Sequence, residues 1–117
     1  MTGAPGLVWE AGIEEEIKAG AEVTFVALGP EDESKDTVLG WFVILVLPDG
    51  KKKLLVKQVK YEPRLFKTYP GISAFAKQHC ADWKSITLPL SPTVRSVKEA
   101  WELIDQADDR DLEGALG

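Results

Sequence analysis

His79 and Cys80 are the only adjacent residues in this sequence that could supply a base and a nucleophile. A cysteine–histidine dyad requires the two side chains to lie within hydrogen-bonding distance of each other. Adjacent residues of a helix do not face each other, and the apolar spacing before this pair predicts a helix. We therefore interpret Cys80 as a buried thiol at a helix end, beside a partly exposed imidazole.

Other catalytic and metal-binding patterns are absent from the sequence. One histidine and one cysteine, without an H-x-x-H or C-x-x-C spacing, exclude a common structural zinc site. The acidic stretch 105–111 lacks the glycine and the spacing of a calcium-binding loop. No glycine-rich phosphate-binding loop and no G-x-S-x-G motif is present. The sequence predicts a protein that is not an enzyme, with no metal and no cofactor.

A basic block between residues 51 and 78 is the remaining candidate for binding chemistry. It carries eight Lys or Arg and one acid, whereas residues 1–50 carry ten acids and two bases. A cationic sheet with aromatic residues can bind single-stranded nucleic acid, and a two-stranded ribbon can enter a major groove. The residues predicted for nucleic-acid contact in the lysine-rich hairpin 51–67 are Lys51, Lys53, Lys57, Lys60, Arg64 and Lys67. Two alternatives remain: a lysine-rich edge that prevents aggregation, or acidic segments of the same or a second chain lying against it.

The composition is that of an ordinary soluble domain. The chain has 117 residues, 44% hydrophobic and 28% charged, with a net charge of −5. Its overall acidity disfavours bulk attraction to nucleic acid, and its longest apolar run is far too short to cross a membrane. A single cysteine and the absence of a signal-peptide pattern predict a cytoplasmic protein.

The elements that position these residues follow from periodicity and turn signals. We expect strands over 21–29, 37–48, 51–61, 64–67 and up to Pro89 from about 84, and helices over 70–80 and 96–106. Ser96 and Glu99 form a capping box, and Ile13 with Ile17 suits a short helical turn. The predicted fold is α+β, an antiparallel sheet of four to five strands with two short helices packed on one face. Residues 1–106 form the domain, and residues 107–117 form an acidic tail expected to fray.

The hairpin around Asp49 and Gly50 carries apolar residues at every position of its first strand. A two-residue turn at these positions pairs Leu45 with Leu54 and Ile44 with Leu55. Both faces of the hairpin are then apolar, and two short helices cover only one of them. We expect the other face to be closed by the N-terminal acidic segment or by another molecule, most simply a second copy in a homodimer. The predicted protein interface comprises Trp9, Trp41, Phe42, Ile44, Val46 and Leu55.

Residues 62–90 resemble a segment of the plasmid-borne partition accessory proteins of the ParC type. The resemblance is carried by a basic strand end, a short helix and a returning strand, with Arg64, Phe66, Lys67, Ile72, Phe75 and Ala76 at the matching positions. It implies a small non-enzymatic helper of a plasmid or other mobile element. The sequence thus predicts an accessory or regulatory protein acting through protein–protein contacts of an apolar sheet face. The alternative is a nucleic-acid-binding protein using the hairpin 51–67.

Overall fold

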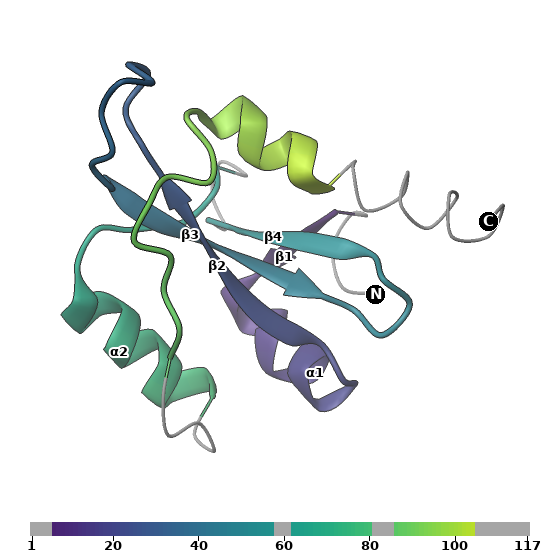
Figure 1. The fold of residues 1–117 in the computed structure, drawn as a ribbon. Coiled ribbons are helices and arrows are strands. Elements are labelled where there is room, and N and C mark those ends of the chain that lie inside the picture. Colours follow the sequence, from purple (N-terminus) through teal and green to yellow (C-terminus); the bar gives the residue numbers. More distant parts are fainter. Residues whose placement is uncertain (1–5, 58–61, 81–85, 105–117) are drawn as a thin grey trace, which may run out of the picture.

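A computed structural model of the 117-residue chain describes residues 6–57, 62–80 and 86–104. Its elements are β1 (Leu7–Trp9), η1 (Glu10–Gly12), α1 (Ile13–Lys18), β2 (Glu22–Leu28), β3 (Gly40–Val46), β4 (Lys52–Val56), β5 (Leu65–Phe66) and α2 (Tyr69–His79). A further helix, the C-terminal helix, is described over residues 97–104. Figure 1 shows one sheet with helices around it. The α+β fold class is confirmed, and the short helix predicted around Ile13 is α1.

The sheet is mixed rather than antiparallel. Its strand order is β1-β4-β3-β2, and β5 pairs with β3. All pairs are antiparallel except β1 with β4, which is parallel and places Val8 opposite Leu55. β1 has only three residues, too few for an alternating pattern to be recognised. The prediction of a purely antiparallel sheet is therefore wrong at this edge.

The predicted hairpin register is wrong by one residue. Ile44 lies opposite Leu54 instead of Leu55, and the loop contains three residues instead of two. A two-residue turn requires the flanking pair, Pro48 and Lys51, to exchange backbone hydrogen bonds, and proline has no N–H to donate. The Leu47 N–H donates to the Lys51 carbonyl instead, at 2.8 Å. Gly50, with φ of +91°, then completes a three-residue loop.

β4 and β5 lie end to end along the same side of β3. Continuing the β4 register would place Val56 opposite Phe42, but Leu65 occupies that position, so the register shifts by nine residues between β4 and β5. We call residues 57–64 the excursion. Its described ends pair with β4, since Val56 bridges to Pro63 and the Arg64 N–H donates to the Leu55 carbonyl. The predicted strand over 51–61 is thus β4 alone among the described residues, while residues 58–61 lie outside them.

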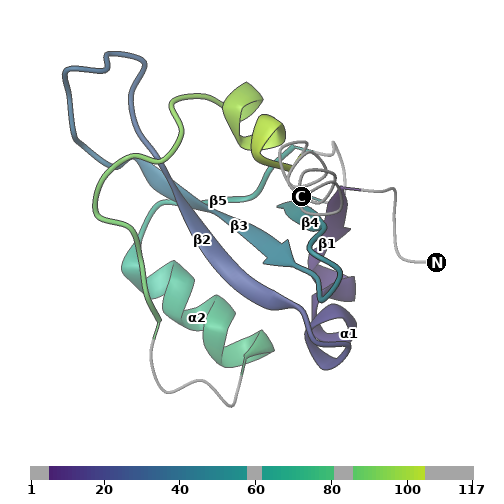
Figure 2. The same ribbon diagram turned by 45° about the vertical axis from the view of Figure 1, so that its right-hand side comes forward.

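Each face of the sheet has its own hydrophobic cluster. On one face α1 and α2 cover the sheet through Ile13, Ile72 and Phe75. On the other face the C-terminal helix covers it through Ala100 and Ile104. Figure 2 shows α2 and the yellow-green C-terminal helix on opposite sides of the sheet. The prediction that both helices lie on one face is therefore wrong. The side chains of β3 are apolar on both faces of the sheet, so each face is covered by a helix of its own.

The segment 86–90 returns along the α2 face without forming a strand. Ile86 and Leu88 pack against the cluster on that face, and the Trp41 Nε1–H donates to the Pro89 carbonyl at 2.9 Å. The strand predicted to end at Pro89 is absent from these residues. The alternating apolar pattern of Ile86 and Leu88 reflects packing against the cluster, which does not require the backbone to pair with another strand. Its first residues and the predicted acidic tail 107–117 lie outside the described residues.

Candidate functional site

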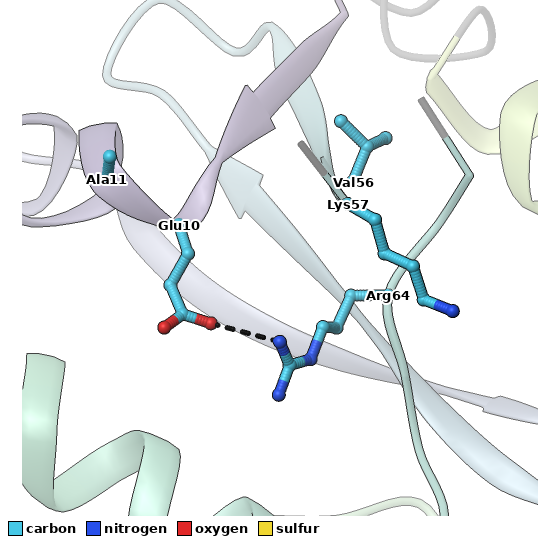
Figure 3. A pocket seen from close by; sticks show the side chains of 5 residues that line it. All are labelled: Glu10, Ala11, Val56, Lys57 and Arg64. Atoms are coloured by element: carbon cyan, nitrogen blue, oxygen red, sulfur yellow. Dashed lines mark ion pairs between the residues drawn. The ribbon is translucent and has the colours of Figure 1, made fainter. Parts of the chain in front are cut away.

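A pocket of about 240 Å³ opens where η1 meets the excursion. Glu10 and Ala11 line it from η1, Val56 from β4, and Lys57 and Arg64 from the ends of the excursion. Figure 3 shows the Glu10 carboxylate and the Arg64 guanidinium pointing toward each other, while the Lys57 side chain extends away from this pair. The pocket thus combines two cationic side chains, one carboxylate and an apolar floor.

The sheet register brings these residues together. The parallel pairing of β1 with β4 places Trp9 opposite Val56, so the residues that follow, Glu10 and Lys57, leave the sheet at the same place. The Lys57 N–H donates to the Glu62 carbonyl at 2.7 Å, which turns the chain back toward β4. Arg64 then returns beside Leu55. The pocket is therefore made by the parallel edge strand and by the excursion.

Arg64 is held by two weak contacts. Its Nη1 lies 3.4 Å from Glu10 Oε1, and its guanidinium carbon lies 5.0 Å from the centre of the Phe66 ring. The side chains of Arg64 and Glu10 remain 46% and 37% exposed. Exposed ion pairs of this kind contribute about 0–1 kcal/mol. A stronger anionic partner can therefore replace Glu10 at the guanidinium.

His79 lies on the other side of Glu10. Its side chain is 7% exposed, and its Nε2 lies 3.3 Å from Glu10 Oε2 while its Nδ1 lies 3.8 Å from Glu14 Oε1. Neither ring nitrogen makes a hydrogen bond to the described residues. Buried polar groups in proteins are normally hydrogen-bonded, so this imidazole is unusual. Glu10 thus stands between a guanidinium and an imidazole.

The other predicted basic residues that the structure describes do not line the pocket. Lys53 Nζ lies 2.8 Å from Glu16 Oε1 of α1, and both side chains are largely buried. Lys51 and Lys67 are exposed, and Lys60 lies outside the described residues. For Lys53 and Arg64 the structure confirms the alternative that acidic segments of the same chain lie against the basic block.

The predicted interface residues are mostly buried within the single chain. The exposed fraction is 6% for Trp41, 1% for Phe42, 3% for Ile44 and 0% for Leu55, whereas Trp9 and Val46 are partly exposed. No partner is needed to cover a sheet face, because α1 of the N-terminal acidic segment, one of the two expected covers, joins α2 on one face and the C-terminal helix covers the other.

The adjacent Cys80 is buried at the end of α2. Burial, followed by the nearby Glu14 carboxylate, raises the pKa of its thiol, which keeps the sulfur protonated and unreactive. Among the described residues, no three His, Cys, Asp or Glu side chains gather in a way that could hold a metal ion. In the same part of the chain, no helix combines the length and apolarity needed to cross a membrane.

Comparison with known proteins gives no relative: no family model, no curated protein and no solved structure matches this chain. The pocket is therefore identified as a candidate site from its geometry alone. Sequence reasoning singled out Lys57 and Arg64 through the basic block but did not connect them with Glu10. Glu10 and His79 lie far apart in the chain, and their proximity follows from the three-residue strand β1, which carries no clear pattern.

Proposed function

We propose that this chain is a small non-enzymatic binding protein that holds an acidic group of a protein partner in the pocket beside Arg64. The observation that carries the proposal is the pocket itself, which the half-exposed Arg64 guanidinium lines together with Lys57 and the apolar residues Ala11 and Val56. A guanidinium binds a carboxylate through charge-assisted hydrogen bonds, and an apolar floor strengthens such bonds by excluding water.

A protein partner fits this surface better than nucleic acid. Nucleic acid is bound by a row of basic side chains that follows its phosphates. Here Lys53 is engaged with Glu16, and Glu10 places negative charge beside Arg64. One half-exposed guanidinium suits a single carboxylate side chain of a peptide, whereas nucleic acid needs several free cations in a row along its phosphates.

The proposed role is accessory or regulatory. The resemblance of residues 62–90 to partition accessory proteins supports a helper without catalytic activity, and it includes Arg64 of the pocket. The single cysteine supports a cytoplasmic location. The apolar sheet face has no part in the proposal, because its residues are buried within the chain.

The test is an NMR titration of the full-length ¹⁵N-labelled chain with a blocked hexaglutamate peptide. We expect shift changes to concentrate on Glu10, Ala11, Val56, Lys57 and Arg64. Arg64→Gln should weaken binding by about tenfold, the equivalent of one charge-assisted hydrogen bond. Lys67→Gln is the matched control, since it removes an exposed positive charge outside the pocket.

Two outcomes would contradict the proposal. One is the absence of binding to hexaglutamate, or equal binding to blocked hexaglutamine. The other is stronger binding to a single-stranded oligothymidylate, with Lys51 and Lys67 contributing as much as Arg64, which would favour the nucleic-acid alternative.

A further inference from the structure

Glu10 contacts two cationic or potentially cationic groups at once. One carboxylate oxygen lies 3.4 Å from Arg64 and the other 3.3 Å from the buried His79 ring. A protonated imidazole at this place would stand between two carboxylates, those of Glu10 and Glu14. The groups facing His79 are Glu10 from η1 and Glu14 from α1, with the Phe75 ring 5.0 Å away and Cys80 adjacent on its own chain segment.

We propose that Glu10 is an internal competitor for the pocket, and that protonation of His79 draws it away from Arg64 so that an external carboxylate can bind there. The inference rests on the proposed function and concerns how the binding of an external carboxylate at Arg64 is regulated. When His79 is neutral, Glu10 has Arg64 as its positively charged partner in the described part of the chain. When His79 carries a proton, Glu10 has a second positively charged partner, and Arg64 becomes available to the ligand.

The direction of the pH effect follows from this competition. A bound carboxylate releases Glu10 toward His79, which favours the imidazolium, so binding takes up a proton. By reciprocity, a lower pH strengthens binding.

The geometry also favours a carboxylate over a phosphate as the ligand. The group already placed against the guanidinium is a carboxylate, and an external carboxylate replaces it with one of the same shape and charge. A phosphate brings more negative charge close to Glu10, whose side chain lines the pocket. We therefore assign the pocket to an acidic side chain of a partner protein.

The experiment measures hexaglutamate affinity for the full chain between about pH 6 and about pH 8, the range over which histidine titrates. We expect the wild-type affinity to fall as the pH rises, by at most about a hundredfold over these two pH units, because at most one proton is linked to binding. Calorimetry in two buffers of different ionisation enthalpy should show proton uptake. Inorganic phosphate, used in a separate titration, should bind more weakly than the peptide.

Two variants distinguish competition from a merely structural role. Glu10→Gln removes the competitor, so its affinity at the higher pH should rise toward the value that the wild type reaches at the lower pH. His79→Gln should bind about as weakly as the high-pH wild type at every pH. Glu62→Gln, an exposed carboxylate on the excursion, is the control and should behave as the wild type.

The inference and the proposed function fail in different ways. Binding that depends on Arg64 but not on pH would overturn the competition and leave the binding pocket in place. A loss of affinity in Glu10→Gln would show that Glu10 helps to bind the ligand, which also overturns the competition. No binding at any pH would overturn the proposed function itself.

Discussion

Gly40 determines how closely β5 can approach β3. A Cβ atom at this position would lie 2.8 Å from the Phe66 carbonyl oxygen and 2.9 Å from the Leu65 side chain. Both neighbours belong to β5, whose backbone has nowhere to move because Phe66 is buried in the core beneath it. Since Arg64 directly precedes β5, this close approach also fixes one wall of the pocket.

Gly40→Ala is expected to destabilise the protein by about 2 kcal/mol, the typical cost of overpacking a buried site. Urea unfolding followed by circular dichroism measures the change in the free energy of unfolding. Thr24→Ala, at an exposed position of the neighbouring strand β2, is the control and should change it by less than about 0.5 kcal/mol. An unchanged stability in Gly40→Ala would mean that β5 is not packed as described.

At the residue scale, the sequence predicts the chemical character of single residues better than it predicts which residues lie close together. The interpretation of Cys80 as a buried thiol is confirmed, and two residues predicted for nucleic-acid contact, Lys57 and Arg64, line the pocket. Their grouping with Lys53 as one basic surface is not observed, because Lys53 is paired with Glu16. The pairing of distant charges depends on the topology, which no local spacing in the sequence reveals.

At the element scale, one proline accounts for the register error. The Asp49-Gly50 pair predicts a two-residue turn, but the missing N–H of Pro48 extends the loop to three residues. A shift of one residue exchanges the faces of a strand. Leu54 consequently packs under the C-terminal helix and Leu55 under α1 and α2. Long apolar strands were predictable, whereas their pairing depended on a single backbone hydrogen bond.

The capping box of the C-terminal helix is confirmed in a modified form. The Glu99 N–H donates to Ser96 Oγ at 3.1 Å, and the Glu99 carboxylate accepts from the Arg95 N–H at 2.8 Å. The side chain of the third helical residue thus reaches one residue further back than expected. This cap begins the helix that covers the second sheet face.

Ser96→Ala is expected to reduce the free energy of unfolding by about 1 kcal/mol, the usual cost of removing an N-cap side chain. Chemical denaturation gives the difference from the wild type. Ser91→Ala, at an exposed position outside any helix, serves as the control. Equal stability of the two variants would argue that the C-terminal helix does not depend on this cap.

For the whole molecule, the two buried sheet faces change the expected oligomeric state. The homodimer predicted from the sequence depended on a face that the chain could not cover by itself. Within the described residues, α1 and α2 cover one face and the C-terminal helix covers the other. The sequence underestimated this coverage because α1 is short and rich in glutamates, yet contributes the fully buried Ile13.

The full chain is therefore expected to sediment as a monomer of 12.9 kDa at micromolar concentration. Analytical ultracentrifugation measures the mass directly. A variant ending at Arg95 provides the comparison, because it lacks the C-terminal helix and exposes Phe42, Ile44 and Leu54. This variant should associate and bind a hydrophobic dye. A wild-type species of twice the mass would restore the homodimer and require a contact surface other than the sheet faces.

The excursion connects two residues of the pocket, Lys57 and Arg64. Both of its ends are fixed by backbone pairing with β4 and by the return of β5 to β3. Lengthening a loop between fixed ends costs little, about 0.6 kcal/mol for each doubling of its length. Residues can therefore be inserted between these two ends at little cost in stability, while β4, β5 and the two pocket residues at the ends, Lys57 and Arg64, keep their places.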